Sequence, residues 1–408
     1  MDLNRREFLT TAAVVGTILR ASPPAAAASG FGEAARADFP WSTRETFLNC
    51  AAYHPIGMHS ARAMREYIDY RLDGPPPELT DIGASGRGTG GEKQAAVKEL
   101  YGRLINARPT EIAFVQSTSD GESVIVAGLD LIHGGGNVVI DDLHYGSAVY
   151  TYKRLEQEHG LEVRVVKHRD WTIDIRDMEA AVDAKTRLVS MALVSNINGY
   201  LHDVKAISAL AHAHGAYVYA DVIQAAGAVP LDVKAMGLDF CACSSYKWLM
   251  GERGFGFLYV REDLQDVVKP MRYGHRQVSS FNVETSIWKP EPGAARYETG
   301  NVSNVAVAGV HESLRYILGL GVPNIRAHVR PLTDRLQREL PAMGYPSITP
   351  PANDTPIVVF RLKDSAKTAE SLKKANVAAT VGEGRIRISP SVFNTQADID
   401  RLLGAIKA

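Results

Sequence analysis

The chain has 408 residues, of which 45 are Lys or Arg and 46 are Asp or Glu, so its formal net charge is −1. This balance excludes the strongly basic surface of a nucleic-acid-binding protein, and the length suits about two domains. The three cysteines form neither a four-ligand metal set nor a dense disulfide framework, so we expect no metal site.

The amino-terminal residues carry the pattern of an export signal. Arg5 and Arg6 precede a modest apolar run at 11–19, and a stretch of small residues, RASPPAAAASG, follows. The pattern resembles a twin-arginine signal, and its apolar run is too short to span a bilayer. We expect residues 1–28 to be removed and the mature protein to be periplasmic and free of the membrane. The alternative is a disordered amphipathic tail.

Seven short runs rich in Val, Ile, Tyr and Phe follow along the chain. They lie at 111–118, 137–142, 162–168, 186–195, 216–222, 240–245 and 254–260. Helical patterns separate several of them, at 120–132, 148–160, 174–184 and 204–215. This alternation predicts an α/β fold with a mostly parallel sheet and helices on both of its faces.

The pattern changes after Asn304. Longer helical patterns occupy 305–321 and 325–344, and short apolar runs follow at 356–362 and 384–390. The change predicts a smaller α+β domain at 305–408 beside a large domain at 61–304. We expect residues 29–60 to form an amino-terminal segment that packs with the small domain.

Three groups of polar residues stand at the ends of predicted strands. Asp221 ends one strand and Lys247 follows the next, so both can reach one crevice at the carboxyl edge of the sheet. Ser117, Thr118 and Ser119 stand where another strand gives way to a helix, which suits the binding of a phosphate. The alternative for these three is an ordinary helix cap.

Together these groups match the needs of pyridoxal phosphate. A lysine bonds to the cofactor aldehyde, and a buried carboxylate keeps the pyridine nitrogen protonated so that the ring accepts electrons. Hydroxyls and backbone amides hold the phosphate. The sequence therefore predicts a pyridoxal-phosphate enzyme.

A longer segment carries a family resemblance. HDVKAISALAHAHGAYVYADVIQAAGAVPLDVKAMGLDFCACSSYKWLMGERGFGFLYV, residues 202–260, resembles the class V aminotransferase family of fold-type I pyridoxal-phosphate enzymes. A weaker resemblance extends from TFLNCAAYHP to RIRISPSVFNTQADIDRLL. The resemblance implies a large domain with a mostly parallel seven-stranded sheet and a smaller C-terminal α+β domain. It also implies an amino-acid-type substrate and a homodimer, because the family builds each site from two subunits.

Carried over position by position, the resemblance implies two catalytic residues. Lys247 would bond to the cofactor and act as the base at the substrate Cα, and Asp221 would pair with the pyridine nitrogen. Gln224 would donate a hydrogen bond to the phenolic oxygen of the ring. The phosphate would be held by Thr118, Ser119, Ser244 and Tyr246.

The remaining roles implied by the resemblance are less direct. Tyr145 would stack over the ring, with His144 as the neighbouring candidate. Asn196 would lie near the ring, unless it only forms a turn. Arg387 would grip the substrate carboxylate, unless it only solubilises a strand edge. Gly300 and Asn301, with Asn in the place of the usual Thr, would reach the phosphate of the partner subunit.

One departure from the family bears on the reaction. Cysteine desulfurases carry a nucleophilic cysteine shortly before the carboxylate-binding arginine, whereas ATVGEGRIRIS at 379–389 has none. We therefore expect that the chain is not a persulfide-forming cysteine desulfurase. The expected function is an aminotransferase or a C–S (β-elimination) lyase acting at Cα. The alternatives are an epimerase or racemase of the isopenicillin N epimerase type and a non-catalytic periplasmic binding protein on the same fold.

Overall fold

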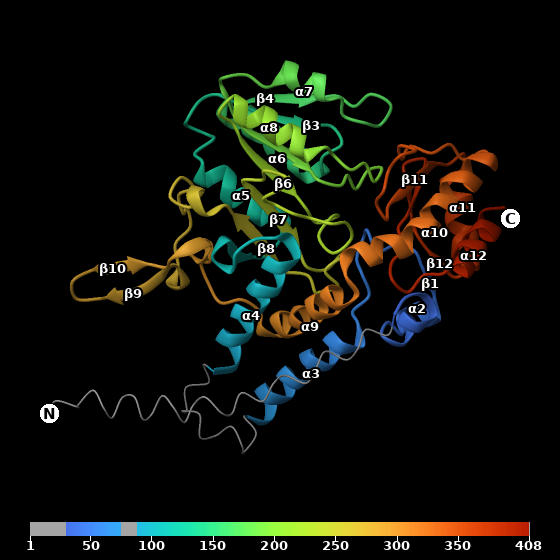
Figure 1. Cartoon of the computed structure of the whole chain (residues 1–408), viewed down its shortest axis with the longest axis horizontal. Helices are drawn as coiled ribbons and strands as arrows, with labels where there is room; N and C mark the ends of the chain where they lie inside the picture. Colours follow the sequence, from blue (N-terminus) through green and yellow to red (C-terminus); the bar gives the residue numbers. More distant parts are fainter. Residues whose placement is uncertain (1–29, 75–87, 408) are drawn as a thin grey trace.

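The computed structural model describes residues 30–74 and 88–407. The predicted export signal at 1–28 lies outside these residues and stays a prediction. The fold is arranged around one large sheet, with a smaller group of helices and strands at one end (Figure 1).

The large sheet has seven strands in the order β2-β8-β7-β6-β5-β3-β4. Strand β8 pairs antiparallel with β2 and β7, and the other neighbours pair parallel. The strands are β2 (Ile112–Val115), β3 (Asn137–Asp141), β4 (Glu162–Val166), β5 (Thr186–Ala192), β6 (Tyr217–Asp221), β7 (Phe240–Ser244) and β8 (Gly256–Val260). The predicted α/β fold with a mostly parallel sheet is confirmed.

Both faces of this sheet are buried, because alternate residues of each strand enter different cores. On β6, Val218 and Ala220 join one apolar cluster, whereas Tyr219 joins the other. Helices α5 (Thr118–Gly128) and α6 (Gly146–His159) supply the cluster that contains Tyr219. The opposite face is covered by α4 (Gly88–Ile105), α7 (Ile175–Ala181), α8 (Val204–Ala213) and α9 (Asn304–Leu320).

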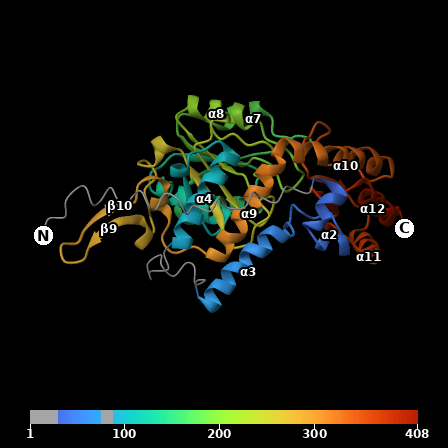
Figure 2. The ribbon, with the colours of Figure 1, turned by 60° about the horizontal axis from the view of Figure 1, so that its bottom comes forward.

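A layer of three helices lies along one side of the large sheet. Helix α3 (Met58–Asp73) packs against α9, and α9 also packs against α4 (Figure 2). Short 3₁₀ turns connect other parts of the chain. They are η2 (Gly32–Ala37), η4 (Pro109–Glu111), η5 (Glu262–Leu264), η6 (His275–Gln277) and η7 (Gly293–Tyr297).

The C-terminal part has its own apolar core, in which Leu336, Phe360 and Leu402 are buried. Its three-stranded antiparallel sheet has the order β11-β14-β13. Its elements are α10 (Val322–Ala342), β11 (Val358–Arg361), α11 (Ser365–Lys374), β12 (Val377–Ala378), β13 (Thr380–Gly382), β14 (Arg385–Ile388) and α12 (Gln396–Lys407). The exact domain boundaries proposed from the sequence stay predictions.

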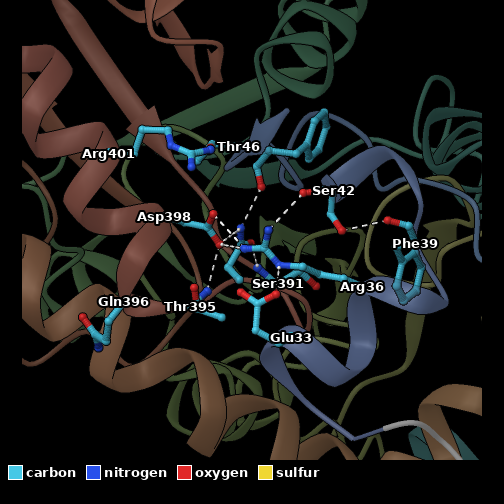
Figure 3. Close-up of polar contacts among 12 residues, drawn as sticks. Glu33, Arg36, Phe39, Ser42, Thr46, Ser391, Thr395, Gln396, Asp398 and Arg401 are labelled. Atoms are coloured by element: carbon cyan, nitrogen blue, oxygen red, sulfur yellow. Dashed lines mark hydrogen bonds and ion pairs between the residues drawn. The ribbon is translucent and has the colours of Figure 1, made fainter. Parts of the chain in front are cut away.

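The first described residues lie against this C-terminal part. After α2 (Trp41–Arg44), the short strand β1 (Thr46–Phe47) pairs parallel with β12. Arg36 donates hydrogen bonds of 2.9 and 2.8 Å to the two carboxylate oxygens of Asp398, and Arg401 donates one of 2.8 Å to Thr46 (Figure 3). Asp398 is buried, so this charge-assisted pair, in which one guanidinium nitrogen contacts both oxygens, joins the two ends of the described chain.

A β-hairpin projects from the body of the molecule, at the left of Figure 1. Its strands are β9 (Val278–Asn282) and β10 (Ile287–Pro290), which pair antiparallel. Large apolar side chains on the hairpin are exposed to solvent: Phe281, Val283, Ile287 and Trp288. The sequence interpretation did not include this hairpin.

Among the described residues, no single helix is long and apolar enough to cross a membrane. Helices α9 and α10 reach that length and composition only as a pair, and they are bent by 74° at their junction. No group of three or more His, Cys, Asp or Glu that could hold a metal occurs in the same part of the chain.

Candidate active site

A cavity lies at the carboxyl ends of β2, β5, β6 and β7. It encloses about 500 Å³ of empty space, its open mouth included. Its polar lining consists of Ser117, Thr118, Ser119, Tyr145, Asn196, Asp221, Gln224, Ser244, Tyr246 and Lys247. The carboxyl edge of a parallel sheet is where ligands gather in open α/β folds. All ten of these residues were singled out in the sequence, and the structure brings them together here.

Lys247 follows β7 and is 8% exposed. Burial lowers the pKa of its ammonium group to about 8, against the attraction of Asp221. Its Nζ lies 5.8 Å from the centroid of the Tyr246 ring and has no hydrogen-bond partner among the described residues. At neutral pH a larger fraction of such an amine is unprotonated than of an ordinary lysine, and only the unprotonated form can act as a nucleophile or base.

Asp221 is the last residue of β6 and is 4% exposed. Burial raises the pKa of its carboxyl group to about 6, although one oxygen accepts a 2.9 Å hydrogen bond from the backbone N–H of Ile223. The charges of His144 and Lys247 oppose this rise. A cation that enters the cavity would stabilise the ionised form of this carboxylate and lower its pKa again.

Two glycines allow the segments around the cavity to approach closely. At Gly121, an added Cβ would lie 2.6 Å from the Cβ of Ala242, so glycine lets α5 sit tightly against β7. Gly227 has a φ of +88°, and an added Cβ would lie 2.5 Å from the carbonyl oxygen of Trp248. These contacts hold the segments that follow Asp221 and Lys247 against each other.

The end of β2 and the end of β7 are joined by reciprocal hydrogen bonds. The backbone N–H of Thr118 donates to the Ser244 hydroxyl at 2.9 Å, and the backbone N–H of Ser244 donates to the Thr118 hydroxyl at 3.0 Å. Ser117 caps α5 by accepting from the N–H of Asp120. The backbone N–H of Ser119 has no partner among the described residues, so it faces the cavity as a free donor at a helix amino terminus.

Trp248 fixes the orientation of the Gln224 amide. The indole N–H donates to Gln224 Oε1 at 2.8 Å, and because indole nitrogen can only donate, the amide oxygen must face it. Gln224 Nε2 donates to the carbonyl of Ala51 at 2.9 Å. The amide nitrogen carries a second hydrogen, which stays available to an acceptor in the cavity.

Tyr145 and His144 have separate positions. Tyr145 lines the cavity and is 42% exposed, whereas His144 is buried. The backbone N–H of Tyr145 donates to His144 Nδ1 at 2.7 Å, so the proton of the neutral ring lies on Nε2, which is 3.1 Å from the Ser190 hydroxyl. Of the two candidates, Tyr145 alone faces the cavity.

Arg387 lies beside Asn196, which lines the cavity. Asn196 Oδ1 is buried and has no partner among the described residues. Arg387, on β14, donates to the backbone carbonyl of Asn196 at 3.1 Å and to the Thr380 hydroxyl at 3.3 Å, and its buried Nε has no partner in the same part of the chain. Burial lowers the pKa of this guanidinium to about 10. An arginine without a carboxylate partner suits a carboxylate ligand.

Gly300 and Asn301 do not line this cavity. Asn301 is exposed and lies near His275, with Oδ1 3.3 Å from Nε2. Their predicted contact is with the phosphate in the partner subunit, so it stays a prediction for a single chain.

Sequence reasoning missed one buried side chain behind the cavity. Glu122, on α5, accepts hydrogen bonds from the hydroxyls of Tyr152 at 2.9 Å and Ser190 at 2.8 Å. His144 Nε2 lies 3.6 Å from the same carboxylate oxygen. The available signal was a Glu next to the apolar stretch of α5, because a carboxylate that is buried there needs hydrogen-bond partners of this kind.

The donors and acceptors of the cavity fit pyridoxal phosphate. Lys247 Nζ and Asn196 Oδ1 lack protein partners among the described residues, and the Ser119 N–H is free beside the Thr118 and Ser244 hydroxyls. When bound, this cofactor withdraws electrons from the substrate Cα and so makes a bond at that carbon easier to break. The fold and the cavity thus define a pyridoxal-phosphate enzyme of the α/β class.

Comparison with known proteins agrees with this assignment. Residues 89–402 match the model of the aminotransferase class-V family, and the chain belongs to that family. A probable cysteine desulfurase of Methanothermobacter thermautotrophicus is 30% identical over 338 residues, which are 81% of this chain and 82% of the relative. The predicted cofactor, pyridoxal phosphate, is confirmed.

Two solved structures share the fold. The apo cysteine desulfurase of Thermococcus onnurineus has a TM-score of 0.82 at 23% identity, covering 92% of this chain and 97% of that chain. The cystine C–S lyase C-DES, in complex with its reaction product cysteine persulfide, also has a TM-score of 0.82, at 18% identity, covering 90% and 98%. The predicted fold-type I architecture is confirmed.

The exclusion of a persulfide-forming desulfurase is wrong. The relative with 30% identity is named a probable cysteine desulfurase, and bacterial relatives with 27% identity over 398 residues are named cysteine desulfurases. The exclusion depended on one missing cysteine at 379–389, which concerns only the place that receives the sulfur. A persulfide can also form on a free product, as the complex of C-DES with cysteine persulfide illustrates. No relative named here supports the epimerase alternative.

Proposed function

We propose that this enzyme cleaves the bond between Cβ and sulfur in a cysteine-type amino acid. The observation that carries the proposal is the buried Lys247 in one cavity with Asp221, with Arg387, which has no carboxylate partner among the described residues, bonded to the backbone of Asn196 in the lining of that cavity. Relatives named cysteine desulfurases support sulfur amino acids as substrates.

Two residues of the chain have separate roles in such a reaction. Arg387 holds the substrate carboxylate by charge-assisted hydrogen bonds. Lys247 Nζ, in its unprotonated form, takes the proton from Cα. In elimination, the Cβ–S bond then breaks and its electron pair leaves with sulfur. In sulfur transfer, an acceptor thiolate attacks the substrate sulfur, and the electron pair of the Cβ–S bond stays with Cβ, which takes up a proton. Elimination consumes one water and gives a thiol, pyruvate and ammonia, whereas transfer of the sulfur to an acceptor thiol gives alanine and a persulfide.

Product analysis tests this proposal. The cofactor-loaded protein is incubated with L-cysteine and with S-(2-carbamoylethyl)-L-cysteine, and pyruvate, alanine, thiol and persulfide are measured. Pyruvate with free thiol, or alanine with persulfide, is the expected result. A keto acid that retains its sulfur would show transamination, and a D-amino acid would show epimerisation; either product without C–S cleavage contradicts the proposal. The same holds if no product forms.

We also propose that the protein is a homodimer in which the β9–β10 hairpin contributes to the contact between subunits. Trp288 and Phe281 are directly opposite across the hairpin and are 61% and 56% exposed. Ile287, beside Trp288, is 66% exposed. An exposed aromatic and aliphatic surface of this kind is typical of a protein interface.

Replacing Trp288 by aspartate is expected to shift the protein from dimer to monomer, because a charge would be buried at the contact. Analytical ultracentrifugation of both proteins measures the change. Tyr150→Asp is the matched control, since Tyr150 is 60% exposed on α6, and it should leave the mass unchanged. A monomeric wild-type protein, or a dimer that tolerates Trp288→Asp, would argue against this interface.

A further inference from the structure

A second hollow adjoins the catalytic cavity at Asn196, which lines both. Its other lining includes Ile197 and residues of the β13–β14 hairpin. The two hollows are therefore neighbours, and the backbone carbonyl of the residue that they share accepts a hydrogen bond from Arg387. Arg387 itself lines the second hollow, so a ligand bound to its guanidinium lies beside the catalytic cavity.

Two arginines line the second hollow from one strand. Arg385 and Arg387 are two residues apart on β14, so their side chains leave the same face of the sheet about 7 Å apart. Arg385 pairs with Glu383 at 2.5 Å, but the Glu383 side chain is 80% exposed. Exposed ion pairs contribute little stability, so a carboxylate in the hollow can replace Glu383. The positive charge of Arg385 also contributes to the lowered pKa of Arg387. A second anion in the hollow would reduce the repulsion between the two guanidinium groups.

Gly382 leaves this hollow open. It pairs directly with Arg385 across the hairpin, so its missing side chain would lie on the same face as the two arginines. An added Cβ there meets nothing within 4 Å, and Gly382 has no positive φ that would require glycine. The hollow can thus be filled by mutation without strain in the backbone.

We propose that the second hollow is a subsite for a second carboxylate on the substrate, carried on the part that leaves with sulfur, and that Arg385 determines this specificity. The substrate class is a cysteine whose sulfur bears a carboxylate-containing group through a thioether or disulfide bond. This inference rests on the proposed C–S cleavage. Arg387 binds the α-carboxylate, and Arg385, about 7 Å further along the strand, binds the distal one.

Two substrates of equal shape test the subsite. S-(2-carboxyethyl)-L-cysteine carries the second carboxylate, and S-(2-carbamoylethyl)-L-cysteine replaces it by a neutral amide. In the wild-type enzyme kcat/KM for the acid is expected to exceed that for the amide at least about tenfold, the effect of one charge-assisted hydrogen bond. Arg385→Gln should bring the acid-to-amide ratio to about one. Glu383→Gln, the matched control, should keep or raise the ratio.

A second variant fills the hollow. Gly382→Phe should lower kcat/KM for both S-substituted substrates relative to L-cysteine, which does not reach the subsite. Thermal unfolding of each variant checks that it is folded. If the wild-type enzyme has the same kcat/KM for the carboxylate substrate and the amide substrate, the proposed subsite is wrong, whereas the proposed C–S cleavage is still supported. If no cysteine-type substrate yields product, the proposed function itself is overturned and the subsite with it.

Discussion

Lys247→Ala is expected to abolish covalent attachment of pyridoxal phosphate and to lower kcat by at least about 10²-fold, the lower end of what a positioned acid–base group contributes. The variant removes the only buried lysine amine that lines the cavity within the described residues. Lys247→Arg should be equally inactive, since a guanidinium stays protonated at neutral pH and cannot act as the base or nucleophile. Borohydride reduction, followed by peptide mapping and mass spectrometry, locates the attached cofactor.

Lys234 supplies the control for this experiment. It is exposed and lies in the same stretch of chain, between β6 and β7. Lys234→Ala should keep the visible absorption of the cofactor-loaded protein and its activity. Cofactor mass on a peptide other than the one containing Lys247, or full activity in Lys247→Ala, would disprove the assigned role.

Asp221→Asn is expected to lower activity by about 10²-fold or more and yet to stabilise the cofactor-free protein. The activity falls because the carboxylate no longer stabilises positive charge on the cofactor ring, an electrostatic contribution of this size. The stability rises because burial raises the pKa of Asp221 to about 6 in the folded chain, above the ordinary value of about 4 for an aspartate carboxyl group. A difference of this kind corresponds to a destabilisation of up to about 3 kcal/mol once the group is ionised.

The sign of the pH dependence follows from the direction of that shift. A raised pKa means that the folded state binds the proton more tightly than the unfolded state, so stability falls as the pH rises from about 4 to about 6. Above that range the full cost is present, and Asp221→Asn should lack this fall. Urea unfolding of cofactor-free protein between pH 4 and pH 8 measures both.

Asp141 is a matched control of opposite sign. It ends β3 and is fully buried, and although burial raises the pKa of its carboxyl group, the neighbouring imidazoles of His202 and His144 and the backbone N–H of Leu143 together outweigh burial and lower it. Asp141→Asn should therefore destabilise the protein at neutral pH. If both substitutions changed the free energy of unfolding by the same amount and in the same direction, the predicted destabilising effect of the ionised Asp221 would be wrong.

Much of the fold and the cavity could be predicted, because the signals are local. The strands of the large sheet are short apolar runs bounded by turn residues, and parallel pairing places Asp221 and Lys247 at one edge. The β9–β10 hairpin gave no such signal, since its side chains are exposed on both faces and no buried period marks it as a strand. Likewise, the missing cysteine at 379–389 was a local signal that could not decide the reaction.

The neighbourhood of Glu122 and the pairing of β1 with β12 depend on contacts between distant parts of the chain. Glu122 became interpretable only when Ser190 on β5 and Tyr152 on α6 were seen beside it. No periodicity in residues 46–47 indicates a partner at 377–378. Such contacts can be recognised only in the tertiary structure, because the hydrophobic pattern of a sequence indicates which face of an element is buried but not which other element covers it.

The contact between the first described residues and the C-terminal helix sets an order of events during synthesis. Arg36 and Asp398 are 362 positions apart, so the ribosome delivers the arginine long before its partner. At ordinary elongation rates the delay is roughly 20 to 70 seconds. During that time β1 has no strand to pair with, and contacts of such high sequence separation also form slowly. The C-terminal part of the molecule therefore completes its folding only after residue 398 has been synthesised.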